Sequence, residues 1–169
     1  MTFLSFEASQ SRPPFRRLFA LGVRYFLLAE LLAVVLALLS RFIFSLFGIE
    51  LEQQEAVSLL SNPDTSLFDT CFLVFASVFL SPVCEEFVFR ICLLDFILKK
   101  TKKVALSVFA VSLIFAICHW NLAAFAPLFG VSVAFSLALV NTKAWIVPIF
   151  SHSLYNLTAV AVALSSRFI

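Results

Sequence analysis

Two adjacent carboxylates and an arginine lie in a segment that is otherwise apolar. The run PVCEEFVFR, residues 82–90, contains Glu85, Glu86 and Arg90. On a helix Glu86 and Arg90 are four residues apart and share a face, whereas Glu85 is turned about 100° from Glu86. An arginine that pairs with one carboxylate leaves the other free to act as a base. The alternative is a purely structural Glu–Arg pair at a helix interface.

Two histidines and an asparagine could complete the chemistry. His119 follows Phe115 by four residues and His152 precedes Asn156 by four, so each pair shares one helix face. A single histidine in an apolar helix is usually a hydrogen-bonded packing residue. Together with Glu85, however, the set offers a base that activates water and groups that stabilise an oxyanion, which needs no metal. A glutamate with two histidines could also bind zinc, although the pattern H-E-x-x-H is absent.

The composition determines which elements must hold these residues. Of the 169 residues, 62% are hydrophobic and 13% are charged, whereas soluble domains carry about 25% charged residues. So few charges cannot solvate the surface of a soluble domain or keep a chain disordered. The net charge of +2 is too small for a nucleic-acid-binding module. We therefore expect a membrane protein whose partner is the lipid bilayer.

Two charge-free runs predict membrane-spanning helices. Residues 104–142 form a run of 39 residues without Asp, Glu, Lys or Arg. As one helix it would span roughly 59 Å, about twice the hydrocarbon core of a bilayer, so it should fold back once. We expect the break between Asn121 and Gly130, where Pro127 and Gly130 oppose a helix. Residues 144–166 are long enough for a further span.

Two upstream stretches, residues 18–49 and 66–98, are apolar apart from a few charges. The second would be roughly 50 Å long as a helix and contains Ser81 followed by Pro82, a helix-start signal. It could form one proline-kinked helix, or a second helix could begin inside the membrane with Glu85 and Glu86 in or near its first turn. The sequence thus predicts an all-α, polytopic transmembrane bundle of about five or six helices.

The charges near the span ends predict the orientation, because Lys and Arg favour the cytoplasmic side. The pattern predicts a multi-pass protein with a cytoplasmic N-terminus, in the plasma or inner membrane of the cell. The basic residues are Arg12, Arg16, Arg17, Arg24, Lys99, Lys100, Lys102, Lys103 and Lys143. The acidic residues on the opposite side are Glu50, Glu52, Glu55 and Asp64.

The candidate residues should lie at similar depths in the membrane. Counted from the basic ends, Glu86, His119 and Asn156 are 13, 16 and 13 residues along their spans. At 1.5 Å per residue these positions lie at depths of roughly 20, 24 and 20 Å, with His152 nearer 14 Å. Polar residues from three spans can therefore meet in one cavity.

These residues carry a family resemblance. In this order they resemble the three motifs of the CPBP family of intramembrane proteases, which includes type II CAAX prenyl endopeptidases and bacteriocin-processing or immunity proteins. The resemblance covers about residues 70–160. The motifs are Glu85-Glu86-x-x-x-Arg90, Phe115-x-x-x-His119 and His152-x-x-x-Asn156.

The resemblance implies an all-helical, glutamate-dependent endopeptidase. By this resemblance, Glu85 and His119 would activate the attacking water, and His152 and Asn156 would hold the oxyanion.

The resemblance also gives Glu86 and Arg90 a supporting role in the catalytic set. No cofactor is expected. Because the family was long described as metalloproteases, zinc remains the alternative, and its ligands would be Glu85, His119 and His152.

We expect residues 1–169 to form a single integral-membrane domain with a protease core at about residues 66–165. The substrate would be a membrane-associated protein or peptide, for example a prenylated tail, a sorting-signal tail, a bacteriocin leader or a lipid-linked peptide. Two other classes stay open. One is a non-catalytic immunity or scaffold protein with the same fold, and the other is a small proton-coupled transporter.

Overall fold

Helices make up the part of the chain that the structure describes. The computed structural model describes residues 14–168, in which there is no strand. Arg12, used above for the orientation, lies outside these residues. The helices are α2 (Phe15–Leu46), α3 (Glu55–Ser61), α4 (Leu67–Phe75), η2 (Ala76–Leu80), α5 (Ser81–Glu86), η3 (Phe87–Leu94), α6 (Asp95–Thr101), α7 (Val104–Cys118), α8 (Leu122–Thr142), α9 (Ile146–Ser165) and η4 (Ser166–Phe168). The predicted all-α fold is confirmed.

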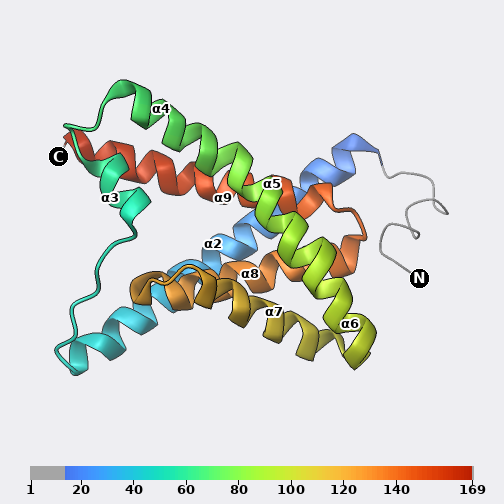
Figure 1. Cartoon of the computed structure of the whole chain (residues 1–169). Helices are drawn as coiled ribbons and strands as arrows, with labels where there is room; N and C mark the ends of the chain where they lie inside the picture. Colours follow the sequence, from blue (N-terminus) through green and yellow to red (C-terminus); the bar gives the residue numbers. More distant parts are fainter. Residues whose placement is uncertain (1–13, 169) are drawn as a thin grey trace.

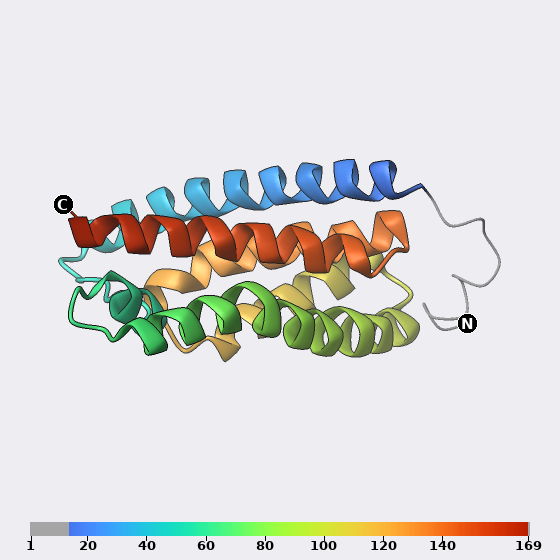
Figure 2. The same ribbon diagram turned by 90° about the horizontal axis from the view of Figure 1, so that it is seen from above.

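Within residues 14–168, four helical segments are long and apolar enough to cross a membrane. They are α2, the continuous segment Leu67–Thr101, α8, and the segment Ile146–Phe168, which is α9 with η4. A further apolar helix, α7, has 15 residues. These segments lie side by side, with α2 and α9 toward one side and α4–α6 toward the other (Figure 2). This arrangement is the helical bundle of a polytopic membrane protein.

The segment Leu67–Thr101 is one uninterrupted helix that contains two widened, π-helical stretches (Figure 1). The first, η2, immediately precedes Ser81, and the backbone of Leu80 and Ser81 is helical. Widened turns of this kind let a helix continue past a proline such as Pro82. The idea of a helix that begins at Ser81 is therefore wrong, and one continuous helix is correct. Its motif carboxylates lie in mid-helix.

The charge-free run folds back earlier than expected. Helix α7 ends at Cys118 and α8 begins at Leu122, where the side chain of Asn121 accepts a hydrogen bond from the amide of Ala124 (2.8 Å). Pro127 lies inside α8, in its second turn. An asparagine N-cap sets the start of α8 because it satisfies a free amide there, whereas a proline near a helix start interrupts few backbone bonds. The break is therefore at the cap and not at the proline.

One face of α8 carries small residues, which let this helix approach α2 closely. A Cβ atom at Gly130 would lie 3.0 Å from Leu32 Cβ and 2.8 Å from Leu36 Cδ1, so any larger residue would force these leucines to shift. Around this contact Ala29, Val131 and other small or branched side chains are fully buried. Small residues allow close packing where water supplies no driving force between helices. Helices α2 and α8 thus form the most extensively packed pair among the described helices.

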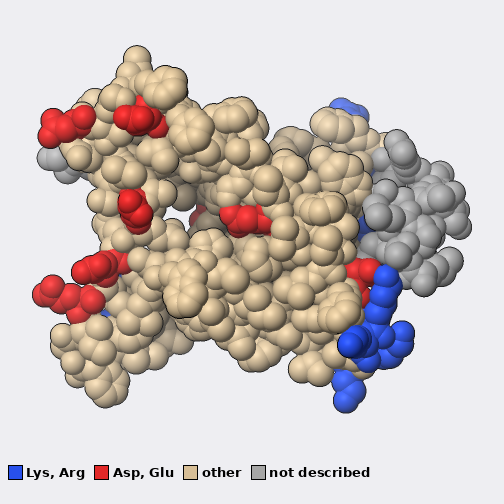
Figure 3. Space-filling view, viewed as in Figure 1, with Lys and Arg blue, Asp and Glu red and all other residues tan. Residues whose placement is uncertain are grey.

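The two ends of the bundle carry opposite charges. Successive long helices run in opposite directions, so the lysines of residues 99–103 lie at one end and the acidic loop of residues 50–64 at the other (Figures 1 and 3). The acidic side chains surround a hollow at their end of the molecule (Figure 3). The basic and acidic connections thus lie at opposite ends of the bundle, as the charge pattern predicts.

Candidate active site

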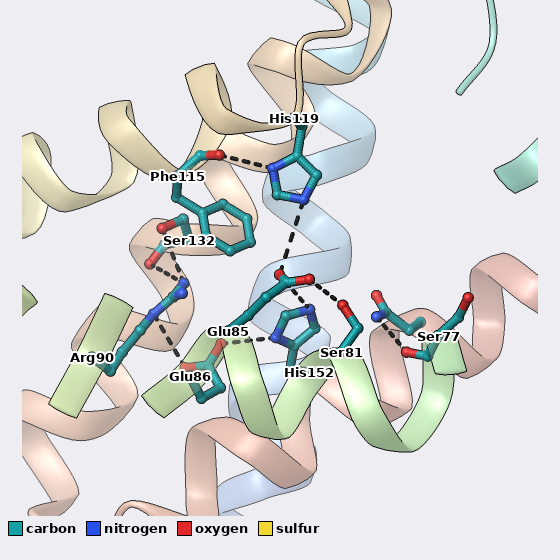
Figure 4. Close-up of polar contacts among 10 residues, drawn as sticks. Ser77, Ser81, Glu85, Glu86, Arg90, Phe115, His119, Ser132 and His152 are labelled. Carbon is teal, nitrogen blue, oxygen red and sulfur yellow. Dashed lines mark hydrogen bonds and ion pairs between the residues drawn. The ribbon is translucent and has the colours of Figure 1, made fainter. Parts of the chain in front are cut away.

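A cavity of about 800 Å³ contains most of the predicted site residues. Glu85 from α5, His119 from the end of α7, and His152 and Asn156 from α9 all line it. Glu85, His119 and His152 point toward one another (Figure 4). Most of the exposed residues in the lining belong to the start of α3 with the two residues before it and to the α7–α8 connection, and we call this part the mouth; it lies at the acidic end.

Glu85 presents one free carboxylate oxygen to this cavity. Its Oε1 accepts a hydrogen bond from the hydroxyl of Ser81, one turn earlier in the same helix. Its Oε2 has no hydrogen-bond partner among the described residues and lies 4.0 Å from His119 Nε2 and 3.8 Å from His152 Nε2. The side chain of Glu85 is 24% exposed and lines the cavity, although Oε2 itself is buried at the point where the two histidines converge.

His119 is held in a defined orientation by the backbone of its own helix. Its Nδ1 lies 2.8 Å from the carbonyl oxygen of Phe115. A carbonyl can only accept, so Nδ1 carries the proton and the neutral ring presents the lone pair of Nε2. That nitrogen faces Glu85 Oε2 across the cavity. The spacing of four residues between Phe115 and His119 thus fixes the tautomer.

His152 is buried and oriented by the second carboxylate. Its Nδ1 lies 2.8 Å from Glu86 Oε1, so Nδ1–H donates a hydrogen bond to this carboxylate. The ring stacks on Phe135 with 4.9 Å between centroids, and Phe115 meets it edge-on at 6.2 Å. These contacts leave only Nε2 directed at Glu85. Glu86 and the two aromatic rings therefore position His152.

Arg90 neutralises Glu86 behind this wall of the cavity. Its Nε lies 3.2 Å from Glu86 Oε2, and Nη2 donates to the hydroxyl of Ser132 on α8 at 3.0 Å. The guanidinium lies 4.7 Å from the centroid of Phe115 and 5.7 Å from that of Phe135. Arg90 is fully buried, and a buried charge is tolerated only where partners replace its hydration.

Asn156 is held by the Ser77 carbonyl, which has no hydrogen-bond donor within its own helix. In η2 the amide of Ser81 bonds to Ala76, five residues earlier. In that register the next carbonyl, of Ser77, faces the nitrogen of Pro82, which has no hydrogen. Asn156 Nδ2 donates to this Ser77 oxygen at 2.8 Å. Pro82 thus leaves the Ser77 carbonyl free to accept from Asn156, which links the two residues.

The structure therefore separates the predicted site residues into two groups. Glu85, His119, His152 and Asn156 meet at the cavity, whereas Glu86 and Arg90 do not line it and lie behind His152.

Sequence reasoning missed three further residues of this cluster. Ser81 was read only as a helix start, although its spacing of four residues from Glu85 was a usable signal. Ser132 and Phe135 gave no signal, because their role depends on how α8 packs.

The donors do not match a zinc site as they stand. Among the described residues no group of three or more His, Cys, Asp or Glu side chains is arranged to hold a metal ion. Tetrahedral ligands about 2.0–2.1 Å from zinc lie about 3.3–3.4 Å from one another. The distances from Glu85 Oε2 to the two histidine nitrogens are 4.0 and 3.8 Å. The mechanism below is therefore derived without a metal.

Comparison with known proteins places the chain in a family. Residues 67–158, more than half of the chain, match the family described as Type II CAAX prenyl endopeptidase Rce1-like. The chain belongs to this family, and its apolar helices are those of a multi-pass membrane protein. The predicted resemblance is confirmed.

A curated relative is the membrane-embedded CAAX protease MroQ of Staphylococcus aureus, 37% identical over 90 residues. The match covers 50% of this chain and 36% of the relative, so the chain corresponds to about a third of that protein's length. No solved structure matches the chain.

Proposed function

We propose that the chain is an intramembrane endopeptidase that hydrolyses a peptide bond with a water molecule activated by Glu85. One observation carries this proposal: the unpartnered Oε2 of Glu85 faces the Nε2 atoms of His119 and His152 at the wall of an open cavity. The family and the relative's name support a membrane-associated protein or peptide as the substrate, including prenylated or sorting-signal-bearing proteins.

The nucleophile would lie between Glu85 and His119. A separation of 4.0 Å between Glu85 Oε2 and His119 Nε2 is too long for a direct hydrogen bond. We place a water oxygen in this gap, about 2.8 Å from each atom, and because Oε2 is buried the side chains must part slightly to admit it. Glu85 takes one proton of this water as the oxygen attacks the carbonyl carbon, and His119 Nε2 accepts the hydrogen bond from the other proton. Glu85 then delivers the proton to the leaving nitrogen.

The oxyanion would be held from α9. Asn156 uses one of its two amide hydrogens on Ser77 and keeps the other for the oxyanion. His152 can contribute through Nε2 only when its ring carries both protons, because Nδ1 already donates to Glu86. Glu86 would stabilise the protonated ring, and Arg90 pairs with the other oxygen of Glu86. In this scheme Glu86 and Arg90 are positioning residues.

We further propose a cytoplasmic N-terminus. The lysines of residues 99–103 would then lie on the cytoplasmic side, and the acidic end with the cavity mouth on the other. Labelling with a membrane-impermeant maleimide tests this in a background whose four native cysteines are replaced by serine. In intact cells Gln54→Cys should be labelled and Lys102→Cys should not. The reverse pattern would contradict the orientation.

Proteolysis by the purified protein tests the function. Variants Glu85→Gln and His119→Ala should lose cleavage of a membrane-peptide substrate. Glu30→Gln is the matched control, because Glu30 is also a carboxylate inside a span but accepts its hydrogen bond from Thr158, away from the cavity. The control should retain cleavage. Unchanged cleavage by Glu85→Gln would refute the mechanism, and a cellular phenotype that persists without any cleavage would favour the scaffold alternative.

Chelation separates this mechanism from zinc catalysis. Activity that survives exhaustive chelation, in protein that contains no metal by elemental analysis, agrees with water activation by the carboxylate alone. Activity that disappears on chelation and returns with added zinc would contradict it.

A further inference from the structure

The charges around the cavity indicate which peptides it accepts. We propose that the cavity selects a peptide with Lys or Arg beside the bond that is cleaved, and that Glu55 is the residue that determines this specificity. The inference rests on the proposed function, because it concerns the substrate of that same site.

Within residues 14–168, the lining of the cavity contains two carboxylates and no lysine or arginine. Glu55 and Glu85 both line it, and none of the described residues that line it is Lys or Arg. Glu85 lies at the reacting centre, whereas Glu55 is exposed and belongs to the part of the lining that α3 contributes. Glu55 forms no ion pair with any other described residue. Its charge is thus available to a ligand in the mouth.

Helix α3 holds Glu55 in place. Leu60, at the other end of this short helix, is 3% exposed and packs with Val160 and Ala163 of α9. Arg167 donates from Nε to the carbonyl of Leu60 at 2.6 Å and from Nη2 to the hydroxyl of Thr70 at 3.1 Å. Arg167 therefore attaches α3 to its neighbours and is not paired with Glu55. These contacts keep α3, and with it Glu55, beside the cavity.

The other polar residues of the mouth are neutral. Gln53, Gln54 and Asn121 line it, and Asn121 Nδ2 donates to the carbonyl of Glu52 at 3.2 Å, which ties the 47–54 connection to the start of α8. A peptide in the mouth would therefore meet amides and the Glu55 carboxylate. An acidic side chain or a free C-terminal carboxylate would be repelled, and a lysine or arginine would be attracted.

A peptide library tests the proposal. Purified protein is incubated with a library of peptides of defined sequence, and the new termini are identified by mass spectrometry, with Glu85→Ala as the blank. We expect Lys or Arg to be enriched within three positions of the cleaved bonds. For a matched pair of peptides that differ by Lys or Glu at the enriched position, we expect wild-type kcat/KM to favour Lys by about threefold to tenfold.

Variants of Glu55 show whether this residue is responsible. Glu55→Gln should abolish the preference for Lys, and Glu55→Lys should reverse it. Asp64→Asn is the matched control, because it removes one exposed charge from the same end without touching the cavity lining. It should keep the wild-type preference.

Each other outcome contradicts a specific statement. Cleavage that depends on Glu85 but shows no basic enrichment overturns the selectivity and leaves the proposed function intact. A preference that survives in both Glu55 variants overturns the role of Glu55. If no cleavage depends on Glu85, the proposed function fails, and the selectivity inferred from it fails too.

Discussion

Glu85 and Glu86 are neighbours in the chain but occupy opposite environments. Glu86 is 1% exposed and lies between Arg90 and His152, which contact its two oxygens. Glu85 is 24% exposed, and its only hydrogen-bond partner among the described residues is Ser81. A rotation of about 100° along one helix separates these two environments.

The difference shows how a membrane helix can hold a reactive carboxylate. A charged group in the bilayer costs about 2.5–3.5 kcal/mol on insertion scales, unless partners or a polar cavity compensate it. Glu86 is compensated by a cation and has no capacity left for chemistry. Glu85 is compensated by the cavity, so one of its oxygens stays available. The pair is therefore one structural and one reactive group.

The largest expected effect comes from the reactive carboxylate. Glu85→Gln should lower kcat/KM by about 10²–10⁴-fold, because a general base is removed while the shape is kept. The thermal unfolding temperature in detergent should stay within a few degrees of wild type, since Glu85 has no buried partner charge. A large loss of stability instead would mean that Glu85 is as structural as Glu86.

For the structural pair Glu86 and Arg90 we expect the opposite result, a large loss of stability. Arg90→Met leaves Glu86 buried without a cation and should destabilise the protein by about 3–5 kcal/mol. The double variant Glu86→Gln, Arg90→Met should recover most of this loss, because the amide still accepts from His152 and no charge is left unpaired. Denaturant titrations of the single and double variants measure the difference. No recovery in the double variant would show that packing of Arg90, and not its charge, is what matters.

The link between Pro82 and Asn156 predicts a smaller effect on stability. Asn156→Ala leaves the carbonyl of Ser77 without a donor and should cost about 1–3 kcal/mol. Adding Pro82→Ala restores an amide that can bond to Ser77, so the double variant should be more stable than Asn156→Ala alone. A strictly additive double-variant cycle would disprove the link.

The smallest effect concerns the hydroxyl that holds Glu85. Ser81→Ala removes one hydrogen bond, typically worth about 1 kcal/mol, and should lower kcat/KM by about fivefold through looser positioning of the carboxylate. Ser81→Thr keeps the hydroxyl and should retain most of the activity. Equal activity of Ser81→Ala and wild type would mean that the neighbouring helices position Glu85.

Part of the fold and of the site could be predicted from the sequence, because it depends on local rules. The scarcity of charge predicts a membrane protein, and the four-residue spacings predict which side chains share a face, as Glu86 with Arg90 do. The break before α8 was placed too late, because the signal of Pro127 was given more weight than the cap at Asn121. The continuity of the helix through Pro82 could not be decided, because a widened turn has no simple sequence signature.

The membrane environment, the helical periodicity and the residue types that are costly in a bilayer can all be read from the amino-acid sequence. These follow from transfer free energies and from the geometry of a single helix, which need no partner. Other features arise from the packing of the helices: Phe135 stacks on His152, Ser132 accepts a hydrogen bond from Arg90, and α3 brings Glu55 to the cavity. Such contacts join residues distant in the chain, and they depend on how helices pack, which local spacing does not specify.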